Sequence, residues 1–290
     1  MVFCESQEDA KRVKEEVLPP WLAERGLTLS EEKTRIVHLT EGFDFLGCNV
    51  KHYHTPQTTR TGFKLLIKPS KKAISRKRGE LREVWLGLKG HNIEAVLAKL
   101  NPIIRGWADY YHTVVSSKVF LTMDNWMHTR ARRYAKHMHP TKPARWRSQR
   151  YFGKLNQDRG DNWVFGNKQS GRYLLKFSWT KIVRHVLVKG TASPDDPSLR
   201  EYWWERKRVN IRHLSPSDVR LADSQDWTCS ICGMHLMNGE ELHRHHKVPK
   251  GKGGSDASSN RELVHLFCHQ QRHAILRKKD RASAGDEQMD

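Results

Sequence analysis

The sequence of 290 residues has few features of a secreted or membrane protein. It contains five cysteines, an odd number without a regular framework of spacings, which argues against a disulfide-bonded secreted domain. No run approaches the roughly 18 consecutive apolar residues that a membrane-spanning helix requires. The first residues also lack the basic segment and apolar core of a signal peptide. We therefore expect a cytoplasmic, nucleoid-associated protein in a reducing compartment, with no membrane partner.

Apolar and acidic residues are both scarce. Apolar residues make up 37% of the chain, which favours several small domains over one large core. Lys and Arg number 52 against 32 Asp and Glu. The surplus lies in residues 61–220, with 34 basic and 12 acidic residues, whereas residues 1–60 have 8 and 10 and residues 221–290 have 10 of each. Such a surplus calls for a polyanionic partner, and we expect nucleic acid.

The first 68 residues predict one helix followed by strands. Ser6 is placed to cap a helix that runs to about Arg25 and ends at Gly26. The pattern of apolar and turn-forming residues then predicts strands at 34–39, 43–53 and 63–67. One helix and three strands cannot close a core. This region is therefore interpreted as the end of an α/β unit.

Residues 69–140 predict a helical bundle. Ser70 opens a very basic helix, a second helix spans about 92–113, and a third spans about 118–138. Pro102 predicts a kink or break in the second helix near Asn101.

Residues 141–220 interleave aromatic residues with cations. Arg145-Trp-Arg and Tyr202-Trp-Trp-Glu-Arg-Lys-Arg are examples, and a strand-like piece covers 173–177. Aromatic rings beside arginine suit base stacking combined with phosphate binding. They would equally suit a small irregular core with a charged rim. The adjacent Asp195 and Asp196, enclosed by prolines, are typical of a solvated loop and not of a catalytic pair.

The last seventy residues contain two sets of metal-ligating side chains. A Cys-x-x-Cys at Cys229 and Cys232, answered by a His-x-x-Cys at His265 and Cys268, has the spacing of a closed structural zinc site. The second set consists of three histidines and leaves one coordination position open: His245, His269 and His273.

The spacing of the second set predicts its local structure. His245 and His246 are neighbours, so on a strand their side chains point to opposite faces. His269 and His273 are four residues apart, so on a helix they share a face. The spacing therefore predicts a β-hairpin followed by a helix, with a metal ion between them.

Two stretches resemble the group II intron reverse transcriptases. Gly26-Leu-Thr-Leu-Ser-Glu-Glu-Lys-Thr-Arg, with Phe43-Asp-Phe-Leu-Gly, resembles the end of their palm. Leu100-Asn-Pro-Ile-Ile-Arg-Gly-Trp-Ala-Asp-Tyr-Tyr resembles the thumb, or maturase, region that grips intron RNA. In this stretch Trp107 and Tyr111 have helical core spacing, which favours packing over RNA stacking for these two rings.

The reverse transcriptase resemblance has a limit. The Tyr-Ala-Asp-Asp turn of the polymerase lies before the region where this chain begins, and it is missing here. The resemblance therefore implies the C-terminal part of a bacterial or organellar intron protein, without reverse transcriptase activity. A natural split, a truncation and a decayed gene all fit, and a separately encoded reverse transcriptase portion is a candidate partner.

The pattern His-His-x-x-Pro, Gly-Gly, Asn, Cys-His-x-x-x-His resembles the HNH nucleases, which have the ββα-metal fold. The resemblance implies that His246 is the general base and that Asn260 holds its loop and orients the imidazole. His243 stands where many members carry a carboxylate. The cysteine-containing set matches the zinc ribbon of intron-encoded members. The catalytic cation, Mg or Mn with Zn as an alternative, would be held by His245, His269 and His273.

We therefore expect a multidomain α+β protein. Its parts are a palm remnant (1–68), a helical thumb or maturase domain (69–140), a basic DNA-binding segment (141–220), an HNH domain with a zinc site (221–277) and a flexible tail (278–290). The side chains expected to contact nucleic acid share a positive charge: Lys71, Lys72, Arg76, Lys77, Arg78, Arg105, Arg130, Arg132, Arg133, Arg145, Arg147, Arg206, Lys207 and Arg208.

Two functions fit these expectations. The first is a metal-dependent DNA endonuclease that nicks one strand, joined to a region that binds group II intron RNA and acting in intron splicing and mobility. The second is a maturase fragment that binds intron RNA and target DNA without cutting, its zinc module only helping to hold DNA.

Overall fold

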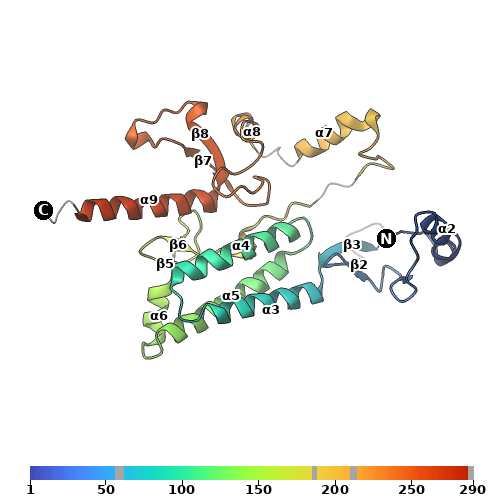
Figure 1. Cartoon of the computed structure of the whole chain (residues 1–290), viewed down its shortest axis with the longest axis horizontal. Helices are drawn as coiled ribbons and strands as arrows, with labels where there is room; N and C mark the ends of the chain where they lie inside the picture. Colours follow the sequence, from blue (N-terminus) through green and yellow to red (C-terminus); the bar gives the residue numbers. More distant parts are fainter. Residues whose placement is uncertain (56–61, 185–187, 210–213, 287–290) are drawn as a thin grey trace. The chain divides into compact units, whose positions relative to one another are not determined.

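The computed structural model describes residues 1–55, 62–184, 188–209 and 214–286, without the side chains of 204, 205, 207–209 and 277–286 (Figure 1). The chain divides into two compact units, Met1–Lys71 and Lys72–Asp290. The second unit spans nearly all of the residues for which the sequence predicts three domains (69–140, 141–220 and 221–277) and a tail (278–290). No helix in the described ranges is long and apolar enough to cross a membrane.

The first unit begins with a helical run whose successive parts are α1 (Gln7–Arg12), a π-helical turn (Val13–Val17) and α2 (Leu18–Ala23). The Ser6 hydroxyl accepts a hydrogen bond from the Asp9 N–H at 3.0 Å, which caps α1 as predicted. Gly26 lies after the run with a φ of +66°, a conformation that glycine adopts without strain. The predicted helix is confirmed.

An antiparallel sheet follows, with strands in the order β1 (Phe43–Phe45), β2 (Cys48–His54) and β3 (Phe63–Pro69). The single strand predicted at 43–53 is wrong, because Leu46 and Gly47 both have positive φ and reverse the chain between β1 and β2. The strand predicted at 34–39 is also wrong. The Thr34 N–H and hydroxyl both bond back to the Ser30 carbonyl, so this stretch starts from a local turn.

The first unit has little apolar interior. Val50, at 6% exposure, and Pro69 are the two buried apolar residues among those described in this unit. The expectation that residues 1–68 cannot close a core agrees with this burial.

The second unit is built on α3 (Lys71–Gly87), α4 (Ile93–Tyr111) and α5 (Ser117–Met138). Their spacing of apolar residues buries Leu81, Leu100 and Phe120 completely. Of the two expectations for Pro102, the break is wrong, because α4 continues through it, and the kink stays a prediction. Proline inside a helix costs about 3 kcal/mol, and the burial of Leu100 and Ile104 on either side offsets that cost.

Residues 144–179 add a second layer to this bundle. They form α6 (Ala144–Tyr151), an antiparallel sheet of β4 (Phe152–Gly153), β5 (Val164–Asn167) and β6 (Arg172–Tyr173), and a 3-10 turn (Phe177–Trp179). The strand predicted at 173–177 is therefore shorter and ends at Tyr173. Asn101 of α4 fixes the exit from β6, because its amide donates to the Tyr173 carbonyl and accepts from the Leu175 N–H.

The aromatic residues of this layer enter the core of the bundle. The Phe165 ring lies 6.0 Å from Trp85, and the Phe177 ring lies 5.4 Å from Trp107 and 6.2 Å from Phe120. The Asp124 carboxylate of α5 accepts hydrogen bonds from the Phe177 and Ser178 N–H groups. Of the two interpretations of this aromatic segment, core packing applies to its buried rings, among them Phe165 and Phe177, and not to the exposed Trp163.

Replacing Phe177 by alanine should lower the free energy of unfolding by about 3–5 kcal/mol, because the ring is completely buried. Chemical denaturation of the full chain measures this. Trp163→Ala is the matched control, since Trp163 lies in the same segment at 60% exposure and should cost no more than about 0.5 kcal/mol. Equal losses for the two variants would contradict the packing described here.

The C-terminal part contains α7 (Arg200–Val209), α8 (Pro216–Asp223), β7 (Leu242–His246), β8 (Arg261–His265) and α9 (Leu266–Asp286). We expected a flexible tail from residue 278, whereas the backbone of α9 continues to Asp286. Lysine, arginine and alanine are good helix formers, and they predominate up to Gly285.

Candidate functional site

The hairpin of β7 and β8 organises the metal-ligating residues. The strands are antiparallel, with His245 opposite Glu262 and His246 opposite Arg261. Because side chains alternate along a strand, His243 and His245 lie on one face while His246 lies on the other. The chain passes from β8 directly into α9. The predicted hairpin followed by a helix is confirmed.

The structure brings the cysteine-containing set together. The ligand atoms of Cys229, Cys232, His265 and Cys268 all lie within 4.8 Å of one another. His265 Nδ1 is 3.5 Å from Cys232 Sγ and 4.0 Å from Cys268 Sγ. A tetrahedral zinc ion would place sulfur and nitrogen ligands about 3.6 Å apart. The set is consistent with zinc.

A hydrogen bond fixes which His265 nitrogen faces the sulfurs. His265 Nε2 lies 3.2 Å from the His235 carbonyl, to which it can only donate. Nδ1 is therefore the nitrogen that faces the sulfurs and would bind a metal ion. The imidazole is completely buried, so the cluster is closed to substrate.

Arg105 connects this cluster to α4. Its Nε donates to Glu240 Oε1 at 2.7 Å, and its terminal nitrogen lies 3.1 Å from His265 Nδ1. The side chain is only 8% exposed. Our expectation that Arg105 contacts nucleic acid is therefore wrong, because a buried and paired guanidinium is not available to a phosphate.

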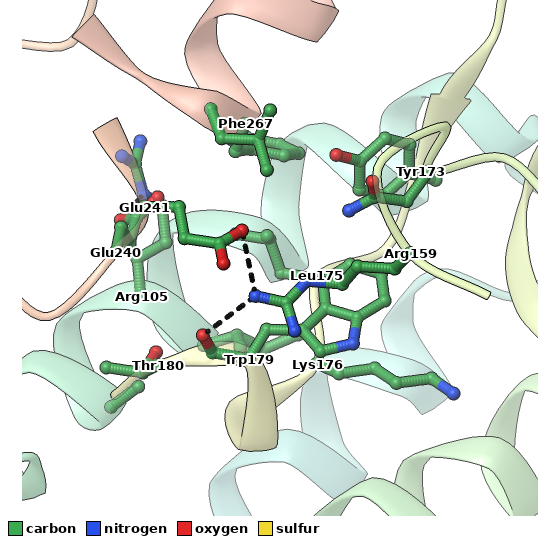
Figure 2. A pocket seen from close by; sticks show the side chains of 14 residues that line it. Arg105, Arg159, Tyr173, Leu175, Lys176, Trp179, Thr180, Glu240, Glu241 and Phe267 are labelled. Carbon is green, nitrogen blue, oxygen red and sulfur yellow. Dashed lines mark hydrogen bonds and ion pairs between the residues drawn. The ribbon is translucent and has the colours of Figure 1, made fainter. Parts of the chain in front are cut away.

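A second ion pair lies beside the first, as Figure 2 shows. Arg159 pairs with Glu241 at 3.1 Å and points its guanidinium at the Trp179 carbonyl. The Tyr173 and Phe267 rings pack edge to face nearby, with centroids 5.5 Å apart. The cavity left among these residues measures about 30 Å³. That volume suits a water molecule and not a substrate.

The histidine set is also assembled. The ligand nitrogens of His245, His269 and His273 lie within 4.8 Å of one another. His269 Nε2 and His273 Nε2 are 3.1 Å apart, and two imidazole ligands of one ion would be about 3.0–3.4 Å apart. His245 is buried, and its Nδ1 has no hydrogen-bond partner in the described part of the chain. These features fit a metal site.

The electrostatics favour neutral rings at the histidine set. Burial lowers the pKa of His269 to about 4, assisted by the neighbouring His273 and His245. Burial also lowers the pKa of His245. A metal ligand must be deprotonated, so these rings are ready to bind at neutral pH. The His243 ring is 5.5 Å from that of His269, so a further imidazole lies beside the set.

His269→Ala should weaken Mn²⁺ binding by more than the roughly 10–100-fold that loss of an outer-shell partner costs. Titration followed by electron paramagnetic resonance measures this. Mn²⁺ is chosen because thiolates select zinc and not manganese, so the cysteine set does not interfere. His137→Ala, at an exposed position of α5, should bind Mn²⁺ like the parent protein. Unchanged binding in His269→Ala would remove this residue from the set.

The loop after His246 is held by hydrogen bonds of one side chain, Asn260. The Asn260 amide donates to the carbonyls of Val248 and Ser255, at 3.0 and 2.8 Å, and its oxygen accepts from the Val248 N–H at 2.8 Å. A Cβ at Gly254 would lie 1.9 Å from the Val248 carbonyl, so only glycine fits there. The structure gives Asn260 a role in holding this loop.

The imidazole of His246 is positioned by a residue that we did not predict. Asp256 Oδ1 lies 2.8 Å from His246 Nε2, whereas the hydrogen bonds of Asn260 go to the loop backbone. No spacing rule marks a carboxylate in this loop. Only the folded loop shows the contact.

Two segments of the second unit match models of known protein families. Residues 74–152 match the group II intron maturase-specific domain, and residues 229–274 match the HNH endonuclease domain. The chain therefore carries a maturase domain and an HNH endonuclease domain. The HNH match covers both metal-ligating sets, and the maturase match runs from α3 to Phe152 at the start of β4. A comparison with curated proteins found no match.

The maturase domain gathers predicted cations from separate motifs. A groove of about 330 Å³ between α5 and α6 is lined by Arg132, Arg133 and Arg147, with Phe152 among the apolar lining residues. His128 and Lys136 also line it and were not predicted. The four cations of this groove come from neighbouring turns of α5 and from α6. The sequence could not show that they share one groove.

The other predicted cations are dispersed. Lys71, Lys72 and Arg76 are exposed on α3, and Arg145 is exposed at the start of α6. Lys77, Arg78 and Arg130 are half-buried. Lys77 forms an ion pair with Glu80, and the Arg130 guanidinium lies over the Trp126 ring. Arg206 lies 5.5 Å from the Trp203 ring on α7. The side chains of Lys207 and Arg208 are outside the described residues.

Proposed function

We propose that this protein is a metal-dependent DNA endonuclease that nicks one strand of its target, joined to a maturase domain that binds group II intron RNA. The observation that carries the proposal is the end of β7. There the neighbouring residues His245 and His246 point to opposite faces, one toward the histidine set and the other toward Asp256. A cation ligand and a proton acceptor are thus adjacent in the chain.

His246 takes the role of general base. A neutral imidazole is the usual proton acceptor near neutral pH. It would remove a proton from the water whose oxygen attacks phosphorus, while one P–O bond of the backbone breaks. Asp256 holds the ring, and Asn260 holds the loop that carries Asp256.

His245, His269 and His273 would hold the cation, with Mg or Mn as the catalytic ion and Zn as an alternative. A cation there would stabilise the charge that develops on the leaving oxygen. The cysteine-containing set serves as a structural zinc site that fixes β8 against α9.

Substrate binding falls to the basic middle of the chain. Residues 221–290 have equal numbers of acidic and basic residues, whereas residues 61–220 have the surplus. We assign intron RNA to the maturase groove lined by Arg132, Arg133 and Arg147, and target DNA to cations nearer the HNH domain. The nick would supply a primer for a separately encoded reverse transcriptase.

A binding protein without nuclease activity is the second candidate. The observation that favours it is His243, which lies beside His269 where many relatives of the HNH family carry a carboxylate. In that case the metal sets would only stabilise a DNA-binding fold.

Nicking of supercoiled plasmid decides between these candidates. Purified protein is incubated with Mg²⁺ or Mn²⁺, with and without group II intron RNA. Conversion to open circles that stops when the divalent ion is omitted supports the nuclease. Intact plasmid under every condition, from protein that retains its zinc and binds DNA, would leave the binding protein.

A further inference from the structure

Three donor side chains converge on the carboxylate of Asp256. Oδ1 lies 2.8 Å from His246 Nε2 and 2.6 Å from a terminal nitrogen of Arg261, and Oδ2 lies 2.7 Å from Lys250 Nζ. These partners lower the pKa of the Asp256 carboxyl, so it is an anion at neutral pH. The exposed Asp256 carboxylate therefore binds three donor side chains that come from separate positions in the chain.

The fold fixes two of these donors, His246 and Arg261, more firmly than it fixes the anion. His246 and Arg261 face each other across the β7–β8 ladder. Lys250 is the first residue of a 3-10 turn, and the Asn260 side chain holds the loop around that turn through hydrogen bonds to the Val248 backbone. Asp256 itself is 53% exposed and lies in a bend between these elements. Two of the donors are thus built into the hairpin, whereas Lys250, at 61% exposure, and the carboxylate are both within reach of solvent.

The donor set suits a phosphodiester. A phosphodiester group carries one negative charge on two non-bridging oxygens, as a carboxylate does. Arginine and lysine are the usual ligands of both groups. The set also includes the imidazole to which the proposed function gives the role of base. A phosphate bound there would lie beside that base.

We propose that His246, Lys250 and Arg261 bind the phosphodiester to be cut, and that the Asp256 carboxylate occupies this anion position until DNA displaces it. The proposal rests on the nuclease function proposed above and names its substrate-binding residues. It makes Asp256 a competitor of the substrate as well as a partner of His246.

The test is a binding experiment without added Mg²⁺ or Mn²⁺, in which fluorescence anisotropy follows a labelled DNA duplex. Asp256→Asn keeps the shape of the side chain and removes its charge, so it should tighten binding by roughly 2- to 5-fold, the range of an exposed ion pair. Lys250→Gln and Arg261→Gln should each lower the slope of log affinity against log salt by about 0.9, the effect of one lost phosphate contact.

A double-mutant cycle then locates the effect. The gain from Asp256→Asn should shrink by at least half when Lys250 or Arg261 is also replaced by glutamine. It should persist in full beside Lys252→Gln, a matched control because Lys252 is an exposed lysine in the same 3-10 turn. A gain of equal size in every background would overturn the proposal, because it would then reflect only the net charge.

Other outcomes are equally decisive. If Asp256→Asn leaves duplex affinity unchanged or weaker and slows nicking, Asp256 only positions His246 and the phosphate site is wrong. If the parent protein never nicks plasmid but the cycle behaves as expected, the phosphate site stands while the nuclease function falls. Zinc content and thermal unfolding of each variant show that the fold is retained.

Discussion

Replacing His246 by alanine is expected to slow DNA nicking by about 10²–10⁴-fold, the usual contribution of a general base. The reason is chemical, because the variant keeps the metal-ligating histidines but has no side chain at this position to accept the proton of the attacking water. Single-turnover nicking at saturating protein, with the divalent ion held constant, measures the chemical step free of substrate binding.

Binding measurements separate this role from a structural one. His246 is one of three donors around Asp256, so its loss should weaken duplex binding no more than a few-fold. Zinc content and unfolding temperature should match those of the parent protein, because His246 is not among the zinc-set ligands. His137→Ala is the matched control and should nick normally. A His246→Ala variant that nicks at more than one tenth of the parent rate would remove this residue as the base.

Much of the metal-binding part could be predicted because ligand spacing is a local property. The Cys-x-x-Cys, the adjacent His245 and His246, and the four-residue step from His269 to His273 each fix a short geometry. The structure places His245 and His246 on β7 and His269 and His273 on α9, as the spacing indicated, whereas the two cysteines lie in a turn before the hairpin. Chemistry that depends on neighbours in the chain is therefore visible in the sequence.

Contacts between distant segments could not be predicted. In the sequence, Arg105 cannot be distinguished from an arginine that binds RNA. Only the structure shows that it is buried and paired with Glu240, 135 residues away in the chain. Asp256 has no pattern to mark it. In residues 144–179 aromatic side chains beside cations fit nucleic-acid stacking and core packing equally well, and the contacts of Phe165 and Phe177 decide for packing. Composition reports which residues are present and not which surface they join.

The strand predicted at 34–39 failed for a related reason. Its apolar and β-branched residues satisfy the propensity of a strand, but a strand also needs a partner. The hydrogen bonds of Thr34 go to Ser30, four residues earlier. A local turn thus provides the hydrogen bond of the Thr34 N–H, where pairing with another strand was expected.

The contact of Arg105 with the cysteine-containing set joins the maturase helix α4 to the HNH domain. Zinc with three thiolates and a neutral imidazole would carry one net negative charge, and Glu240 adds another. The buried Arg105 guanidinium offsets part of this charge, and its pKa is raised chiefly by Glu240 against the effect of burial. Helix α4 of the maturase domain therefore directly contacts the cysteine-containing set of the HNH domain.

Arg105→Met is expected to lower the free energy of unfolding by about 3–5 kcal/mol, because it leaves the Glu240 charge buried without its partner. The variant should also release zinc to a chromogenic chelator faster than the parent protein. Replacing both partners, as Arg105→Met with Glu240→Leu, should restore most of the stability, since a buried pair exchanged for apolar residues is often neutral. Zinc release should stay fast in the double variant, because the charge that faces the thiolates is still missing.

The matched control is Arg159→Met. Arg159 pairs with Glu241 in the same interface, but the two side chains are 28% and 37% exposed, so its loss should cost no more than about 1 kcal/mol. Denaturation of the full chain compares the variants, and the chelator assay follows zinc. Arg105→Met and Arg159→Met with the same stability and the same rate of zinc release would show that Arg105 is an ordinary interface ion pair. A larger loss in Arg105→Met alone would mean that the maturase helix α4 and the zinc site are stabilised together.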